Sequence, residues 1–220
     1  MSRFHKKSIA GIALVLALAL SITACGGAKK ANKAKQDTKP ATTTEQTVDT
    51  KSTAAVAYED AKLTDTIHYP QLTQAPGELT MDYMNQSLQA PAAALQEMAG
   101  DKKELSYEVT RSDNDMLSVL YTQTVTQADG TAVKTLIPVN LQVATGTELT
   151  MDNAFSDSAA VRKLLGAEGE KAEGVQFYLN DQGAVFFYRP AEGKDYVTVE
   201  VKSDALAPYW NDSVGEKPAS

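Results

Sequence analysis

The spacing of apolar residues changes at Gly100, and this change constrains the fold more than any other feature of the sequence. Between residues 77 and 99, apolar side chains recur every three or four positions, which is the spacing of one helix face. Pro91 either kinks this helix or begins a second helical segment at its first turn. After Gly100, apolar residues alternate with polar ones, as in strands with one buried face. The helix positions that share the apolar spacing are Leu79, Tyr83 or Met84, Leu88, Ala92, Leu95 and Met98.

Three alternating segments follow Gly100, and short turns rich in Asp, Asn and Gly separate them. The segments lie at residues 105–109, 117–125 and 133–143, with turns at 112–115 and 128–130. Strands joined by such short turns form an antiparallel meander. The other side of these strands is rich in Ser, Thr, Gln and Lys, so we expect water to cover it.

The segments on either side of the meander add further strands and a short helix. Pro70 limits the first of them to the edge or the end of a sheet. Asp157 or Ser158 is expected to cap the short helix, and Gly166 to end it. We therefore predict an α+β fold: a mostly antiparallel sheet, made of a meander plus a hairpin, with one long and one short helix packed on one face. The added elements are an extended segment at 63–72, the short helix within 151–165, a hairpin of 175–179 with 185–187, and a strand at 195–202.

The first 24 residues resemble a bacterial lipoprotein signal peptide. Lys6 and Lys7 precede an apolar run at residues 9–20, and small residues stand before Cys25. We expect Cys25 to carry a diacylglycerol and to hold the mature protein on the outer face of the cell membrane, or in an outer membrane if the cell has one. An ordinary secreted protein would leave a free thiol, and a membrane-spanning helix needs about 20 apolar residues, so both alternatives fit less well.

Composition limits both the source of stability and the choice of partners. Cys25 is the only cysteine among the 220 residues, so a buried core must stabilise the fold without an internal disulfide. The chain has 21 basic and 28 acidic residues, and the signal peptide holds three of the basic ones and no acidic one, which leaves a mature charge of about −10. Such a charge disfavours nucleic acid and weakly favours basic partners, although solvated surface carboxylates are the simpler explanation.

Composition also divides the chain into four predicted segments. The stretch after Cys25 is rich in Ala, Lys, Thr and Gln and has almost no large apolar side chain before Val56, so it cannot form a core. The part that follows is long enough for one domain with a core of its own. The predicted segments are a signal peptide at 1–24, a lipidated N-terminus and disordered linker at 25–60, a single domain at 61–212, and a flexible tail at 213–220.

We find no catalytic or metal-binding motif in the sequence. His68 would be the only histidine of the mature chain, and its place beside Tyr69 and Pro70 suits packing or solvent contact better than catalysis or metal ligation. The acidic residues at 113–115 and 152–153 lack the regular ligands of a calcium loop, so turn chemistry explains them. No carboxylate stands in an apolar sequence context that would raise its pKa. We therefore expect a protein that is not an enzyme and that needs no metal or cofactor.

Aromatic residues crowd the predicted hairpin, and two more lie near the end of the chain. A platform that binds carbohydrate or protein is one interpretation of the hairpin residues. Core packing is favoured, because alternate residues of a strand must fill the core. We expect Tyr209 and Trp210 to form a lid on the core, with an exposed anchor as the alternative. The hairpin residues are Phe177, Tyr178, Phe186, Phe187 and Tyr188.

Several short stretches of the domain form a pattern in a fixed order. They are IHYPQL at 67–72 before MN at 84–85, LSV at 117–119, IPVNL at 137–141 running into TGTELTMDNAF at 145–155, FYL at 177–179 and FFYRP at 186–190. Over residues 61–207 this order resembles the RsiV-like / PdaC N-terminal domain family. That family occurs in lysozyme-sensing anti-sigma factors, beside peptidoglycan deacetylases, and alone in lipoproteins.

The resemblance implies a fold and a cellular setting. The loops at 127–132 and 191–195 depart from the family's pattern, so no functional residue is carried over and the ligand-binding residues stay unassigned. We expect a lipid-anchored binding or sensor-like module of the cell envelope that recognises peptidoglycan or a basic, lysozyme-type protein. Two alternatives stay open: an accessory subunit or enzyme of cell-wall modification, and a passive structural lipoprotein. The enzyme alternative requires perturbed carboxylates that converge in a cleft.

Overall fold

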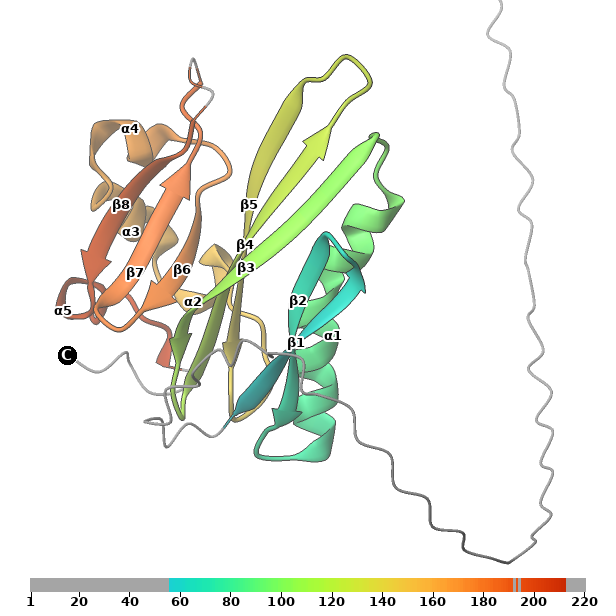
Figure 1. The fold of residues 1–220 in the computed structure, drawn as a ribbon. Helices are drawn as coiled ribbons and strands as arrows, with labels where there is room; N and C mark the ends of the chain where they lie inside the picture. The colour runs from blue at the N-terminus through green and yellow to red at the C-terminus, as the bar shows by residue number, and fades with distance from the viewer. Residues whose placement is uncertain (1–55, 192, 194, 213–220) are drawn as a thin grey trace, which may run out of the picture. The chain divides into compact units, whose positions relative to one another are not determined.

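The computed structural model describes residues 56–191, 193 and 195–212, all of which belong to one compact unit, 48–220 (Figure 1). The predicted signal peptide, the lipidated Cys25 and the linker as far as residue 55 lie outside the described residues, and so does the predicted tail at 213–220. None of the helices in the described ranges has the length and apolar character needed to cross a membrane.

A five-stranded sheet forms the first half of this unit. Its last three strands, residues 102–142, are the antiparallel meander that the alternation predicts, and β2 runs parallel to β3 where Ile67 meets Leu105. The first strand takes residues 57–60 from the predicted linker, because backbone pairing with β2 holds a strand whose side chains are mostly exposed. The strands follow chain order in the sheet: β1 (Ala57–Thr64), β2 (Ile67–Gln74), β3 (Lys102–Ser112), β4 (Met116–Thr126) and β5 (Ala132–Gln142).

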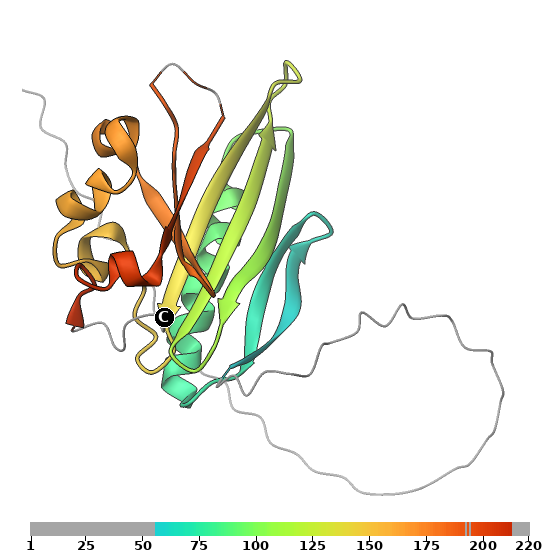
Figure 2. The same cartoon turned by 90° about the vertical axis from the view of Figure 1, so that its left-hand side faces the viewer.

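The predicted long helix, α1 (Glu78–Glu97), covers one face of this sheet (Figure 2). Pro91 stays inside the continuous helix and is buried, so it does not begin a second segment. Tyr83 is exposed and Met84 is buried, which decides between these two candidates for the inner face. Leu79 and Met98 are exposed although we expected them to face inward, because they lie at the two ends of the helix, beyond the buried stripe.

A three-stranded antiparallel sheet and four short helices form the second half. The predicted short helix within 151–165 is two separate helices, α2 and α3, and Gly166, with a φ of +79°, begins a third helix, α4, instead of ending the helical segment. Asp157 caps α3 as predicted, by accepting a hydrogen bond from the backbone N–H of Ala160 at 2.9 Å. The elements are α2 (Met151–Ala154), α3 (Ser158–Lys163), α4 (Gly166–Lys171), β6 (Gln176–Asn180), β7 (Gly183–Tyr188), β8 (Val197–Lys202) and α5 (Ser203–Leu206).

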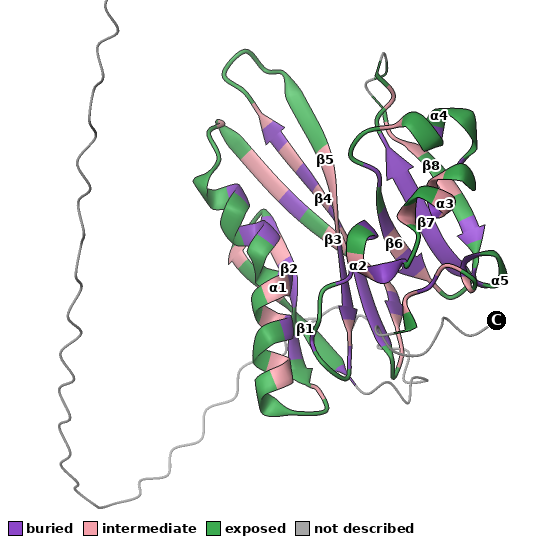
Figure 3. Cartoon of the chain, turned by 180° about the vertical axis from the view of Figure 1, so that it is seen from behind, coloured by how far each residue is buried: buried purple, intermediate pink, exposed green. Residues whose placement is uncertain are grey.

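The predicted α+β class is therefore confirmed, and the strands divide between two sheets with separate hydrophobic cores. One core lies between α1 and the five-stranded sheet. The other lies between the three-stranded sheet and the short helices, where β7 is buried along its whole length (Figure 3). We expected the helices to share one face of one sheet. Instead, each of the two sheets has its own helices packed on it.

Candidate functional site

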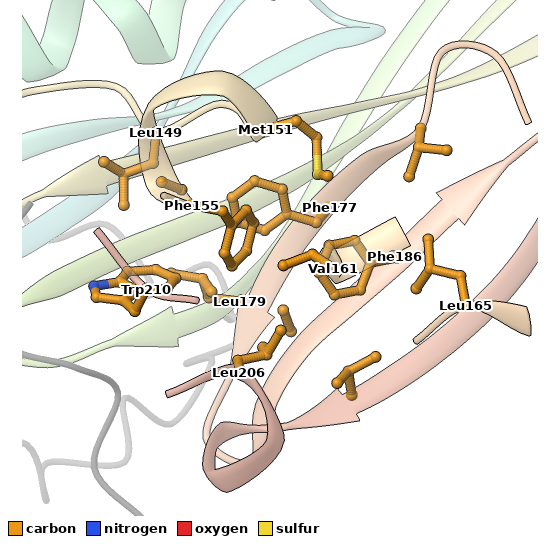
Figure 4. Packing of buried hydrophobic residues seen from close by; sticks show 14 of the residues in the cluster. Leu149, Met151, Phe155, Val161, Leu165, Phe177, Leu179, Phe186, Leu206 and Trp210 are labelled. Atoms are coloured by element: carbon orange, nitrogen blue, oxygen red, sulfur yellow. The ribbon is translucent and has the colours of Figure 1, made fainter. Parts of the chain in front are cut away.

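Phe177, Phe186 and Tyr188 of the hairpin belong to the second core. The ring of Phe155 lies 5.2 Å from that of Phe177 and 5.9 Å from that of Phe186, between ring centroids. Trp210 meets Phe155 edge-on at 5.4 Å and closes the cluster (Figure 4). All the hairpin aromatics except the half-exposed Tyr178 are buried. Core packing is therefore the correct interpretation for Phe177, Phe186 and Tyr188, and Trp210 forms the expected lid together with the half-buried Tyr209. Phe187 is buried outside this core, where its ring lies 5.5 Å from that of Tyr196.

A buried polar junction joins this half to the five-stranded sheet. The hydroxyl of Ser118 on β4 donates to Oδ1 of Asn140 on β5 at 2.7 Å, and Nδ2 of Asn140 donates to the carbonyl of Phe177 at 2.9 Å. The N–H of Leu179 donates to Oγ of Ser118 at 3.0 Å. The polar side of the meander, which we expected to be wet, is thus dry where β6 crosses it, because two side chains satisfy the backbone of that strand.

A cleft of about 300 Å³ opens beside this junction. Its walls come from β5, from the segment that leads into α2, and from the start of β6. Leu149, Met151, Val175 and Phe177 make the floor apolar and buried. The other lining residues are Pro138, Asn140, Glu148, Thr150, Asp152, Gly174 and Gln176.

The polar groups of the cleft give it a negative character. Glu148 and Asp152 are the charged lining residues, and none of the residues that line it is basic. Glu148 reaches solvent, yet burial against the surrounding protein atoms raises the pKa of its carboxyl group. A carboxylate that is partly desolvated without a cationic neighbour is well suited to receive a positively charged or hydrogen-bond-donating group.

A tight loop after β5 places Glu148 at this cleft. Gly146 has a φ of +72°, a conformation that glycine adopts without strain, and it reverses the chain. The returning segment pairs with β5 through Leu149, whose N–H donates to the carbonyl of Asn140 at 2.8 Å. Asn153 then caps the start of α2 by accepting from the N–H of Thr150 at 2.7 Å. Backbone bonds on both sides therefore hold Glu148 in place.

His68 lies outside this cleft, on the β1–β2 hairpin. Its Nδ1 is 2.9 Å from Oδ2 of Asp60, and its Nε2 is 3.2 Å from the carbonyl oxygen of Asp65. The hydrogen bond with the Asp60 carboxylate, and then that with the Asp65 carbonyl, raise the pKa of the imidazole. Because both ring nitrogens face acceptors, His68 fastens the hairpin, and among the described residues it belongs to no group that could hold a metal ion.

The acidic turn at residues 113–115 has a structural explanation, as predicted. Oδ1 of Asp113 accepts from the N–H groups of Asp115 and Met116, and Oδ2 accepts from Nε of Arg111 at 2.6 Å. Throughout the part of the chain that the structure describes, no group of three or more His, Cys, Asp or Glu side chains is placed to hold a metal ion.

Comparison with known proteins concerns the fold. No protein-family model matches the sequence, and no curated protein does either. The structure is similar to the crystal structure of a member of the DUF3298 family from Bacteroides fragilis NCTC 9343, with a TM-score of 0.55 and 12% sequence identity over 76% of this chain and 97% of that one.

At this identity the likeness shows the fold alone. DUF3298 is the RsiV/PdaC-like domain family, so the fold that the sequence resemblance implied is confirmed.

The sequence analysis missed Glu148 as a candidate site residue. Its neighbours in sequence, Thr147 and Leu149, do not mark an apolar setting, and the burial that raises its pKa exists only in the folded protein. The residue does lie within 145–155, one of the stretches that carry the resemblance to the family. Its place in this stretch was the one sequence signal for a site here. That signal marks the loop as part of the pattern but does not mark the Glu148 carboxylate as a binding group.

Proposed function

We propose that this protein is a lipid-anchored binding module of the cell envelope, and that the cleft at Glu148 and Asp152 is its binding site. The single observation that supports the proposal best is the cleft itself: an apolar floor bordered by two acidic side chains and by no basic one. Partners that present positive charge beside apolar surface fit such a site. A basic, lysozyme-type protein is the partner class with this chemistry, and peptidoglycan with free amines is the other ligand expected from the sequence.

Anchoring and binding require separate tests. Labelling of the expressed chain with a fatty acid, compared with a Cys25→Ala variant, tests the anchor; we expect label in the membrane fraction and its loss in the variant. Label on the variant, or none on the parent chain, would remove the membrane from the proposal.

Binding is tested with the full chain in mild detergent, by measuring its affinity for lysozyme and its retention on purified peptidoglycan. The double variant Glu148→Gln with Asp152→Asn removes both charges of the cleft while keeping the shapes of the side chains. We expect a loss of affinity of about tenfold or more, as for charge-assisted contacts worth about 1.5 kcal/mol or more. The double variant Glu170→Gln with Asp181→Asn, at exposed positions on α4 and in the β6–β7 turn, is the matched control for two lost surface charges.

Retention of neither ligand by the parent chain would refute both named partner classes. Equal binding by the double variant and the parent would refute the cleft as the site. If the parent chain retains neither ligand, a passive structural lipoprotein, one of the alternatives left open by the sequence, becomes the better description.

One observation favours a second candidate, an enzyme of cell-wall modification. Glu148 has a raised pKa and shares a cleft with Asp152, which is the arrangement that such an enzyme needs for a general acid beside a second carboxylate. Release of reducing ends or peptides from peptidoglycan by the full chain, abolished in Glu148→Gln while retention persists, would establish it. No release above the Glu148→Gln background would leave binding as the function.

A further inference from the structure

The outer strands of the two sheets differ in how their free edges are covered. On β5, Arg189 donates to the carbonyl of Lys134, and the hydroxyl of Tyr196 accepts from the N–H of Leu136 at 3.2 Å. Pro138, further along this strand, has no N–H to offer. Side chains of the second half therefore block β5 against pairing with another strand.

The other edges leave β1 as the most accessible one. On β6, Ser118 and Asn140 occupy the backbone groups of Phe177 and Leu179. β8 has six residues and runs directly into α5. β1 has eight residues and no proline, and within the described ranges no strand pairs with its outer side.

The bonds of β2 determine which groups β1 presents to its free edge. The N–H of Leu72 donates to Oδ1 of Asn85 at 2.7 Å, and the carbonyl of Leu72 accepts from Nδ2 of Asn85 at 3.2 Å. Both backbone groups of Leu72 therefore point away from β1. Backbone N–H and C=O groups of alternate residues point to the same side of a strand, so those of Pro70 and His68 also point away from β1. Pro70, which has no N–H, therefore costs the β1–β2 ladder no hydrogen bond.

Pairs whose backbone groups point away from each other are the non-hydrogen-bonded pairs of an antiparallel ladder. The residues of β1 opposite Leu72, Pro70 and His68 therefore turn their own N–H and C=O groups toward the free edge. These residues are Tyr58, Asp60 and Lys62. A strand that docks here would bond to these three residues.

The charges along β1 are complementary to those of a second, antiparallel copy of the same strand. Asp60 and Lys62 are two positions apart, so they lie on the same side of the strand. If two β1 strands pair antiparallel about a twofold axis at Ala61, Asp60 of each copy lies opposite Lys62 of the other. Pairing about Asp60 instead would place two carboxylates opposite each other.

We propose that a second copy of this chain occupies the edge, through antiparallel pairing of the two β1 strands about Ala61. The proposal is independent of the function proposed for the cleft. Charge complementarity selects the second copy as the occupant, and it also selects this register. The half-exposed Tyr58 side chain, 42% accessible in the single chain, would lie opposite Thr64 of the other copy.

Disulfide trapping tests this register. In the paired strands Ala61 faces its own copy as a non-hydrogen-bonded pair, with about 4.5 Å between Cα atoms, which lies within the range of about 4.4–6.8 Å for disulfides. The full chain carries Cys25→Ser, so that an introduced thiol is the only one. We expect Ala61→Cys to form disulfide-linked dimers on mild oxidation, with a yield about tenfold above that of Glu59→Cys, whose two copies would lie about 13 Å apart.

A mixture of two chains gives an independent readout that does not alter Ala61. Residue 59 of one copy lies opposite residue 63 of the other in this register, so Glu59→Cys chains mixed with Leu63→Cys chains should form heterodimers, while neither does so alone. Equal yields at all positions, or no dimer in both experiments, would overturn the proposal and leave the edge to an extended segment of another protein. A higher yield from Asp60→Cys than from Ala61→Cys would overturn the register and the charge argument with it.

Discussion

Ser118 and Asn140 form a hydrogen bond of 2.7 Å between neighbouring strands, and both side chains turn from this bond to the backbone of β6. Both residues are inaccessible to solvent, with 0% and 1% of their surface exposed. A pair of small polar side chains therefore joins two sheets whose cores are otherwise separate. The candidate cleft lies directly beside this pair, since Asn140 is one of its lining residues.

Loss of the junction is expected to destabilise the whole domain. Asn140→Ala removes the donor to the buried carbonyl of Phe177 and the acceptor of the Ser118 O–H, at a cost of about 2–4 kcal/mol in the free energy of unfolding. Urea unfolding of the full chain measures this cost. Ser106→Ala, an exposed change on β3, should shift the free energy by less than about 0.5 kcal/mol. A loss for Asn140→Ala as small as that of the control would show that the junction does not hold the sheets together.

Two substitutions at Trp210 separate the contribution of its ring to stability from the cost of its unpartnered N–H. The indole is 3% exposed, and among the described residues its Nε1 has no hydrogen-bond partner. Trp210→Phe keeps an aromatic ring against Phe155 and removes the unpartnered N–H, so we expect a loss of stability of about 1 kcal/mol or less. Trp210→Ala opens a cavity and should cost about 3–5 kcal/mol. Circular dichroism follows unfolding, because Trp210 is the only tryptophan; equal losses for both variants would contradict this account.

The His68 pair gives the β1–β2 hairpin a dependence on pH. Because the folded state raises the pKa of this imidazole above its usual 6.5, the bond to Asp60 contributes its full stability below that value and loses it as the pH rises through the folded pKa. An NMR titration should show the His68 imidazole titrating above its usual pKa of 6.5. Asp60→Asn should bring the His68 pKa down toward 6.5, and an unchanged value would contradict the assigned cause.

Glu148 should also affect stability through its charge. A carboxyl whose pKa is raised on folding stabilises the folded state fully below its unfolded value of 4.5, and this contribution is lost as the pH rises through the folded value. Glu148→Gln cannot ionise, so at pH 7 we expect it to be at least as stable as the parent chain, and at pH 4 the two should converge. Urea unfolding at both values measures this, with the exposed Glu170→Gln on α4 as the control for a lost surface charge. Strong destabilisation by Glu148→Gln at pH 7 would contradict a site kept for binding.

The elements that could be predicted are those whose burial pattern and turns are determined by residues close together in the sequence. Leu88, Ala92 and Leu95 are spaced for a helix face, and they are buried against the sheet as expected. The meander follows from strict alternation and from turn residues such as Asp113, which bonds its own turn. Burial of Phe186 and Tyr188, two positions apart, follows from the same alternation, whereas the burial of Phe187 between them does not. In each case the residues that determine the structure are near neighbours in the chain.

The division into two sheets, the first strand and the cleft depend on contacts between distant residues. Asn140 is 37 residues from Phe177, and no spacing in the sequence marks that a polar face will be covered there. β1 is held by backbone pairing, which leaves no hydrophobic pattern in its exposed side chains. The pKa of Glu148 is raised by partial burial that exists only in the folded protein. Periodicity and turn chemistry are local and therefore readable from the chain, whereas burial of polar groups and the field around a carboxylate exist only once the two halves have packed.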